Sequence, residues 1–94
     1  MLAIARFSVP LAQSQEFADQ LAVAKDVLSL REGFIDAELG QNLDDPTLWV
    51  LMTQWKNVGS YRRALSSLEV KMLAVPVLAQ ALDEPGAYES ERNA

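Results

Sequence analysis

The chain contains neither cysteine nor histidine among its 94 residues. These two absences exclude Ser-His and Cys-His nucleophile pairs, imidazole or thiolate metal sites, and histidine or cysteine axial ligands of haem. Any chemistry therefore depends on carboxylates, tyrosine, arginine, tryptophan N–H groups, the backbone or the substrate itself. We accordingly expect a protein that uses no metal and no cofactor.

Positive charge is also scarce, with 8 Lys and Arg residues against 13 Asp and Glu residues and a net charge of −5. Nucleic-acid-binding surfaces normally carry a basic stripe, so we expect no nucleic-acid partner. No apolar run approaches the roughly 20 residues of a membrane helix, and no basic leader precedes an apolar stretch at the N-terminus. With no cysteine to stabilise a small secreted scaffold, these features predict a cytoplasmic protein without a membrane partner.

The length and the spacing of apolar residues predict one α+β domain over residues 1–94, with a frayed tail at residues 91–94. Apolar side chains recur with the helical period from Phe17 to Leu28, and Asn57 is placed to cap a second helix. The expected strands are residues 2–9, 34–41, 47–55 and 87–90, and the expected helical segments are residues 12–30, 57–68 and 69–82, with a kink or a new helix at Pro76.

The order β-α-β-β-α-β is typical of the ferredoxin-like split β-α-β fold, in which both helices cover one face of a four-stranded antiparallel sheet. If a four-residue turn joins the two central strands, Phe34 pairs with Trp55 and the pairing continues at every second residue. One face of this hairpin then holds Phe34, Asp36, Glu38, Gly40, Trp49, Leu51, Thr53 and Trp55, and the other holds Ile35, Ala37, Leu39, Gln41, Leu48, Val50, Met52 and Gln54. A one-residue bulge would exchange these partners.

Both faces of this hairpin carry large apolar side chains, but the helices can cover only one of them. Leaving the other face in water costs about 25 cal/mol for each Å² of apolar surface. The simplest remedy is a second copy of the chain packed sheet against sheet. We therefore expect a two-fold homodimer through the sheet faces.

Trp55 closes the third strand and Tyr61 falls in the first turns of the next helix, which brings two large rings to one corner. This corner is the packed hinge of a small domain, the wall of an aromatic-ligand pocket, or both. As a site residue, Trp55 would present its indole N–H to a substrate oxygen that gains negative charge, and Tyr61 would exchange a hydrogen bond with a ligand phenol. As structural residues, Trp55 would pack the core and Tyr61 would place its hydroxyl in water.

Three charged residues are further candidates. Asp36 and Glu38 lie on the face predicted to hold Trp55, and if that face lines a cavity, a raised pKa would make one of these carboxyl groups a base. Otherwise both are solvated or interface carboxylates. Arg6 lies mid-strand among apolar residues and needs a partner, either a substrate anion or an acid across the sheet or dimer.

Four short motifs follow one another along the chain. They are Gly33-Phe34, Asp44-Asp45-Pro46, the pattern Trp55-Lys56-Asn57 with Tyr61, Ala64, Leu65 and Ser67, and the late Pro85-Gly86-x-Tyr88. In their order and spacing, over residues 2 to 90, the chain resembles the antibiotic biosynthesis monooxygenase family of the dimeric α/β-barrel superfamily.

The resemblance implies a homodimer with a cavity between sheet and helices in each subunit. The resemblance further implies the chemistry of those members that act on aromatic polyketides or quinols. They resemble oxygenases that need no cofactor, because the deprotonated substrate itself passes an electron to O2. The tryptophan and tyrosine of such sites match Trp55 and Tyr61, whereas an asparagine that they place four residues before the tryptophan is Leu51 here. We expect a small aromatic or quinol-type ligand to contact Arg6, Phe34, Leu51, Thr53 and Met72 as well.

These features predict a cofactor-independent monooxygenase with Trp55, Tyr61, Asp36 and Glu38 as the catalytic candidates. Two alternatives stay open. One is a non-catalytic small-molecule-binding or dimerisation module of the same fold, and the other is an isomerase or lyase that uses a strand carboxylate as its base. The fold does not choose among them, because one scaffold hosts many chemistries.

Overall fold

Strands and helices follow one another in the predicted order in the computed structural model, which describes residues 1–91. The strands are β1 (Leu2–Ser8), β2 (Phe34–Gln41), β3 (Leu48–Trp55) and β4 (Ala87–Tyr88), and the helices are α1 (Ser14–Ser29), α2 (Val58–Ser66), α3 (Leu68–Leu73) and α4 (Val75–Leu78), with a 3-10 turn η1 (Leu11–Gln13) before α1. The predicted frayed tail, except for Glu91, lies outside the described residues.

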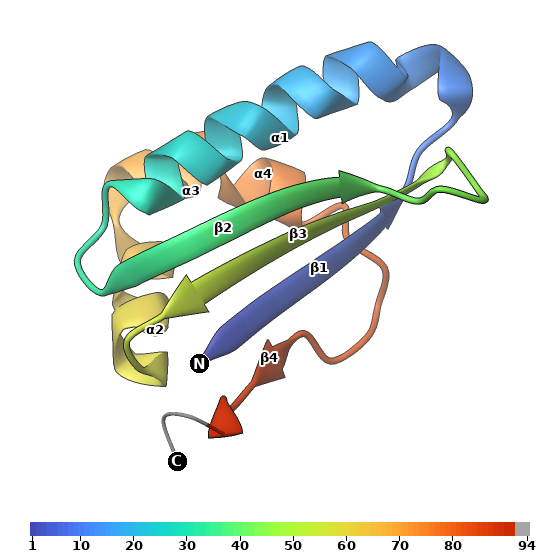
Figure 1. Ribbon diagram of the computed structural model, residues 1–94. Coiled ribbons are helices and arrows are strands. Elements are labelled where there is room, and N and C mark those ends of the chain that lie inside the picture. Colours follow the sequence, from blue (N-terminus) through green and yellow to red (C-terminus); the bar gives the residue numbers. More distant parts are fainter. Residues whose placement is uncertain (92–94) are drawn as a thin grey trace.

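The four strands form one antiparallel sheet in the order β2-β3-β1-β4, and the helices pack on one face of it (Figure 1). The predicted α+β, ferredoxin-like architecture is therefore confirmed. In the described part of the chain the sheet is open rather than closed into a barrel, with β2 and β4 at its edges. None of the helices within residues 1–91 is long and apolar enough to cross a membrane.

The core lies between α1 and the inner face of the sheet, the face that the helices cover. The predicted stripe of α1 from Phe17 to Leu28 is buried, and Val27 joins it. From the sheet, Phe7 and Leu51 are buried in the same cluster, and the Phe7 and Phe17 rings lie 5.0 Å apart. The helical period alone therefore located the buried face of this helix.

The second helical region is divided into three short helices by local capping. The Asn57 side chain accepts a hydrogen bond from the backbone N–H of Ser60 at 2.8 Å, so the predicted cap of α2 is confirmed. The Ser67 side chain caps α3 in the same way, which the sequence analysis had missed. Pro76 lies in the first turn of the separate helix α4, where its missing N–H costs no helical hydrogen bond.

The β2-β3 hairpin contains a β-bulge that overturns most of the predicted register. Phe34 pairs with Trp55 as predicted, but the register shifts before Asp36, which pairs with Gln54. Because side chains alternate along a strand, this shift exchanges the faces of β2. The inner face holds Phe34, Ala37, Leu39, Trp49, Leu51, Thr53 and Trp55, and the outer face holds Asp36, Glu38, Gly40, Val50, Met52 and Gln54.

Ile35 is the additional residue at this bulge, and its side chain is 53% exposed. The Asp36 carboxylate accepts a hydrogen bond from the backbone N–H of Ala37 at 2.8 Å, which satisfies a donor beside the irregular pairing. The prediction that Asp36 and Glu38 share a face with Thr53 and Trp55 is therefore wrong. The physical reason is one extra residue in β2.

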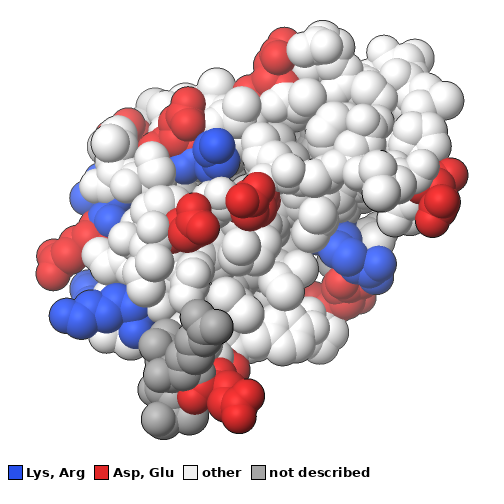
Figure 2. Space-filling model, viewed as in Figure 1, with Lys and Arg blue, Asp and Glu red and all other residues white. Residues whose placement is uncertain are grey.

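The outer face of the sheet has no helix over it among the described residues. Figure 2, viewed from this side, shows a largely uncharged surface with acidic side chains over β2. Ile4, Val50 and Met52 lie on this face and are half-buried, while Arg6 is exposed. The predicted apolar outer face is thus present, whereas the homodimer through it stays a prediction.

The segment before β4 runs along the free edge of β1. The backbone N–H of Leu82 donates to the carbonyl of Arg6 at 2.8 Å, and the N–H of Ile4 donates to the carbonyl of Gly86 at 2.7 Å. A Cβ atom at Gly86 would overlap with the carbonyl oxygen of Ile4, so glycine permits this close approach. This segment therefore covers the edge of β1 that β3 leaves free.

Candidate functional site

A cavity of about 230 Å³ lies between the inner face of the sheet and the helices. β1, β3, α1, α2, α4 and the start of β4 all contribute to its wall. The lining residues are Ala3, Ile4, Ala5, Leu28, Leu51, Thr53, Tyr61, Leu78, Gly86 and Ala87. Because none of these described lining residues is charged, the cavity suits an apolar ligand with few polar groups.

Trp55 lies at the centre of an aromatic cluster beside this cavity. Its side chain is 0% exposed, and its ring centroid is 5.4 Å from that of Phe34 and 5.7 Å from that of Tyr61. Phe34 meets the indole edge-on at 87°, a favoured aromatic geometry. The two rings predicted to share a corner are therefore in contact, but Trp55 and Phe34 pack behind the cavity wall rather than lining it.

The indole N–H of Trp55 already has a partner within the protein. Nε1 donates a hydrogen bond to Oγ1 of Thr53 at 2.8 Å, and both residues are buried. Thr53 itself lines the cavity. Within residues 1–91, the hydroxyl hydrogen of Thr53 has no acceptor.

Tyr61 contributes the second hydroxyl of the cavity wall. Burial raises the pKa of Tyr61 above its ordinary value of 10.0, because an ionised phenolate would lose its hydration. Its hydroxyl makes no hydrogen bond with the described part of the chain. At neutral pH this side chain is a protonated phenol that can donate to a ligand.

Leu51 and Thr53 are the predicted ligand-contacting residues that the structure brings to the cavity. Arg6 lies on the outer face, where it makes two hydrogen bonds to the Glu84 carboxylate at 2.6 and 2.8 Å. Those bonds from the guanidinium lower the pKa of Glu84. Arg6 therefore has an acid partner within the chain, one of the two alternatives expected for it.

Asp36, Glu38 and Met72 are the remaining predicted site residues, and all three lie away from this cavity. The two carboxylates are on the outer face because of the bulge. Met72 in α3 is 65% exposed and lines a different hollow with Pro76 and neighbouring residues. No carboxylate among the described residues therefore reaches the cavity of this chain.

The small residues of the wall were missed by the sequence analysis. Ala3 and Ala5 on β1 face Thr53 and Leu51 across the sheet, so β1 presents methyl groups where larger side chains would fill the space. Alternating alanines on the inner face of a central strand were the available signal. Their pattern was interpreted as part of a strand, not as the floor of a cavity.

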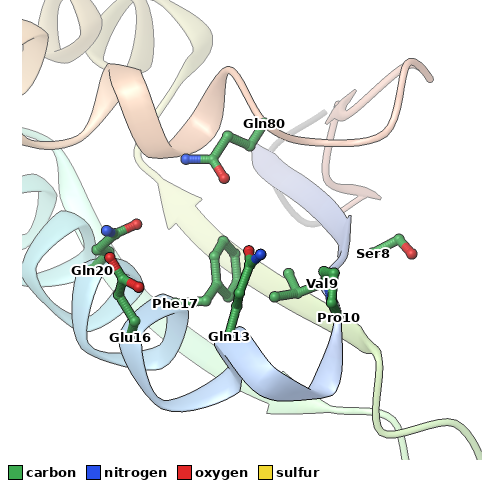
Figure 3. A pocket seen from close by; sticks show the side chains of 8 residues that line it. All are labelled: Ser8, Val9, Pro10, Gln13, Glu16, Phe17, Gln20 and Gln80. Atoms are coloured by element: carbon green, nitrogen blue, oxygen red, sulfur yellow. The ribbon is translucent and has the colours of Figure 1, made fainter.

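A second hollow of about 230 Å³ lies near the start of α1 (Figure 3). The side chains of Gln13, Glu16 and Gln20 lie on one side of it and Gln80 on the other, around the Phe17 ring. It is polar where the first cavity is apolar, and none of the predicted site residues lines it. Among residues 1–91, no three His, Cys, Asp or Glu side chains are grouped closely enough to hold a metal ion.

Comparison with known proteins adds to this geometry. Residues 1–74 match the model of a family described as antibiotic biosynthesis monooxygenase. No curated protein matches the sequence.

Solved structures from two organisms are similar to this chain. A conserved protein from Methanosarcina mazei Go1 is 26% identical with a TM-score of 0.74, over 92% of this chain and 84% of that chain. A mutant of SnoaB, a cofactor-independent oxygenase from Streptomyces nogalater, is 23% identical with a TM-score of 0.82, over 96% of this chain and 91% of that chain. At the latter identity the likeness shows a common fold.

Proposed function

Because this chain belongs to the antibiotic biosynthesis monooxygenase family, we propose that it is a monooxygenase that oxidises a small aromatic or quinol-type substrate with O2 and without a cofactor. The observation that carries this function is the apolar cavity of about 230 Å³ with its two hydroxyl groups. Ligand pockets are commonly about 300–1,000 Å³ in volume, so this cavity favours a substrate of one or two rings over a larger polycycle.

The chemistry begins with loss of a proton from an activated C–H or phenolic O–H of the substrate. The anion passes one electron to O2, and the substrate radical and superoxide combine to form a C–O bond. A proton then converts the peroxide anion to a hydroperoxide, which loses water and leaves a carbonyl group. For an activated CH2 group, one oxygen atom of O2 enters the product and the other leaves as water.

The protein supplies binding and hydrogen bonds to this sequence of steps. Since no described carboxylate lines the cavity, the first proton passes to water, and the substrate must itself be acidic enough to ionise. Thr53 and Tyr61 are the hydroxyl groups beside the charge that develops. Trp55 holds both side chains in place, because its ring packs against Tyr61 and its indole N–H donates to Thr53.

A homodimer through the outer sheet face is part of the proposed assembly. Support comes from the half-buried Ile4, Val50 and Met52 on the face that lacks a helix. Met52→Glu would place a second carboxylate beside Glu38, its partner in the sheet, and we expect this variant to be monomeric. Light scattering measures the mass, and a monomeric wild-type protein would contradict this assembly.

A non-catalytic binding module of the same fold is the second candidate. The specific observation in its favour is the apolar side chain of Leu51 in the cavity wall, where similar oxygenases place an asparagine. An isomerase or lyase has less support, because Asp36 and Glu38 lie on the outer face and would reach a substrate only at an interface with another chain.

Oxygen uptake with a panel of hydroquinones, naphthols and anthrones tests the proposed function. We expect uptake above buffer autoxidation with at least one substrate, and a severalfold fall in Trp55→Phe. Trp49→Phe is the matched control, since the Trp55 indole donates to Thr53 of the cavity wall, whereas the Trp49 indole has no hydrogen-bond partner among residues 1–91. Thermal stabilisation by these compounds without any oxygen uptake would instead establish the binding module.

A further inference from the structure

We propose that Thr53 is the hydrogen-bond donor to a carbonyl or enolate oxygen of the bound ligand, and that Trp55 is a positioning residue that acts through Thr53. This inference rests on the proposed function in one respect, because the ligand is taken to be the substrate or product of the cavity described above. It reassigns the polar contact of the site from the indole to a threonine two residues earlier in β3.

The indole nitrogen of Trp55 carries a single hydrogen, and Thr53 already accepts it. An indole N–H donates one hydrogen bond and accepts none. In this chain it lies 2.8 Å from Oγ1 of Thr53 and the Trp55 side chain is 0% exposed, so it is not presented to a ligand. A direct contact between Trp55 and the substrate would require this bond to break and the packed ring cluster to move.

The Thr53 hydroxyl that accepts this hydrogen bond still has a hydrogen of its own to donate. A threonine hydroxyl has one hydrogen to donate and two lone pairs. The indole occupies one lone pair, and within residues 1–91 no protein acceptor takes the hydrogen. Thr53 is 3% exposed and lines the cavity, so the ligand is the remaining partner of this buried donor. Donation from the indole also polarises the hydroxyl and strengthens the bond that it donates.

The lining of the cavity restricts the class of ligand that it can bind. None of the described lining residues is charged, and burying an unpaired charge is strongly unfavourable. The ligand therefore enters in a neutral form with at least one acceptor oxygen, as the carbonyl of a one- or two-ring quinone or hydroxyquinone does. Carboxylates, phosphates and cationic amines are excluded as preferred ligands of this cavity. When the substrate ionises, the charge delocalises onto the oxygen that Thr53 contacts.

The test uses unlabelled and carbonyl-13C-labelled 1,4-naphthoquinone as the probe and infrared difference spectroscopy as the readout. In the wild-type protein we expect the carbonyl stretch of the bound probe to move to lower frequency than in an apolar solvent. In Thr53→Val, which replaces the hydroxyl by a methyl group, we expect the shift to be lost and the probe to bind about tenfold more weakly. Thr53→Ser keeps a hydroxyl and should retain the shift, which also covers the case in which the valine variant does not fold.

A double-mutant comparison separates the two roles assigned to Thr53 and Trp55. Trp55→Phe should reduce the carbonyl shift in the wild-type background and have no further effect on it in the Thr53→Val background. Trp49→Phe removes the same indole group elsewhere in the chain and should leave the carbonyl shift unchanged. Additive effects of Trp55→Phe and Thr53→Val would overturn the positioning role, since they would indicate a separate indole contact.

The outcomes are distinguishable from failure of the proposed function. A carbonyl shift that depends on Thr53 without oxygen uptake by any substrate would refute the monooxygenase and keep the donor. Oxygen uptake with an unchanged carbonyl shift in Thr53→Val would keep the monooxygenase and overturn the donor. Failure of 1,4-naphthoquinone to bind the wild-type protein would overturn the ligand class inferred from the cavity wall.

Discussion

Replacing each of the two tryptophans by phenylalanine should have opposite effects, because the substitution removes a hydrogen bond at Trp55 and an unpaired buried donor at Trp49. Nε1 of Trp55 donates to Thr53, whereas Nε1 of Trp49 is buried and has no partner among residues 1–91. Trp49 packs edge-on against Phe17, with ring centroids 6.0 Å apart. Replacing either residue by phenylalanine removes the same atoms and keeps a six-membered ring at the contact.

The expected difference in stability follows from the hydrogen bonds. Trp55→Phe loses a buried bond, and a typical bond contributes about 0.5–1.5 kcal/mol net. Trp49→Phe instead removes a buried unsatisfied donor, a group whose burial costs about 1–3 kcal/mol. From the hydrogen bonds alone, Trp55→Phe should be less stable than Trp49→Phe by about 2–4 kcal/mol. For a domain of this size that corresponds to a difference in Tm of roughly 10 °C or more. Trp55 is fully buried and Trp49 only half-buried, so the larger loss of apolar contact at Trp55 adds to this difference in the same direction.

Urea denaturation followed by circular dichroism measures this difference. The protein concentration must be held equal, because association stabilises the folded state by mass action. Equal m-values would show that both variants unfold the same structure. If Trp49→Phe is destabilised as much as Trp55→Phe, the indole of Trp49 has a partner in solution, and the hydrogen-bond assignment at both positions is refuted.

Three further perturbations address the backbone, the helix cap and the phenol. Gly33→Ala should destabilise by more than about 1 kcal/mol, because φ is 87° there and the new Cβ would overlap with Ser60; Gly59→Ala in α2 is the control, and equal urea midpoints would contradict the prediction. Asn57→Ala should lower the unfolding free energy by about 1 kcal/mol through loss of the α2 cap, and an unchanged midpoint would argue against that cap. Burial raises the pKa of Tyr61 in the folded state, so its contribution to stability is constant below the unfolded pKa of 10.0 and falls as the pH rises through the folded pKa. In Tyr61→Phe, the urea midpoint should therefore decrease less at alkaline pH than in the wild-type protein. The same dependence of the midpoint on pH in both proteins would contradict this prediction.

The secondary structure of this chain was largely predictable because its signals are local. The bounds of β2, the buried stripe of α1 and the cap at Asn57 each follow from residues a few positions apart. The helical stretch from 69 to 82 was less accurate, since the cap by Ser67 and the break at Ala74 divide it into α3 and α4, which ends at Leu78. The lengths of α3 and α4 are set by the residues at their ends, not by the average helix preference of the whole stretch.

The site was predictable only in part, because its geometry depends on pairing between strands. Nothing local in the sequence requires an extra residue at Ile35, so the faces of Asp36 and Glu38 were assigned wrongly. The bond between Thr53 and Trp55 had an available signal that was not used. Residues two apart on a strand lie on the same face, so a hydroxyl and an indole at that spacing are neighbours.

The bulge in β2 decides whether the two carboxylates of this strand face the solvent or the helices. If β2 paired with β3 without the bulge, Ile35 would lie opposite Gln54 and Asp36 opposite Thr53, and both carboxylates of this strand would turn toward the helices without a change in any residue. Deleting Ile35 would not have this effect, because Phe34 would stay opposite Trp55 and Asp36 opposite Gln54 in unbroken alternation. Homologous chains with the same residues in this strand but no bulge should accordingly have an acidic chamber that carries its own base, whereas the bulge keeps this one neutral.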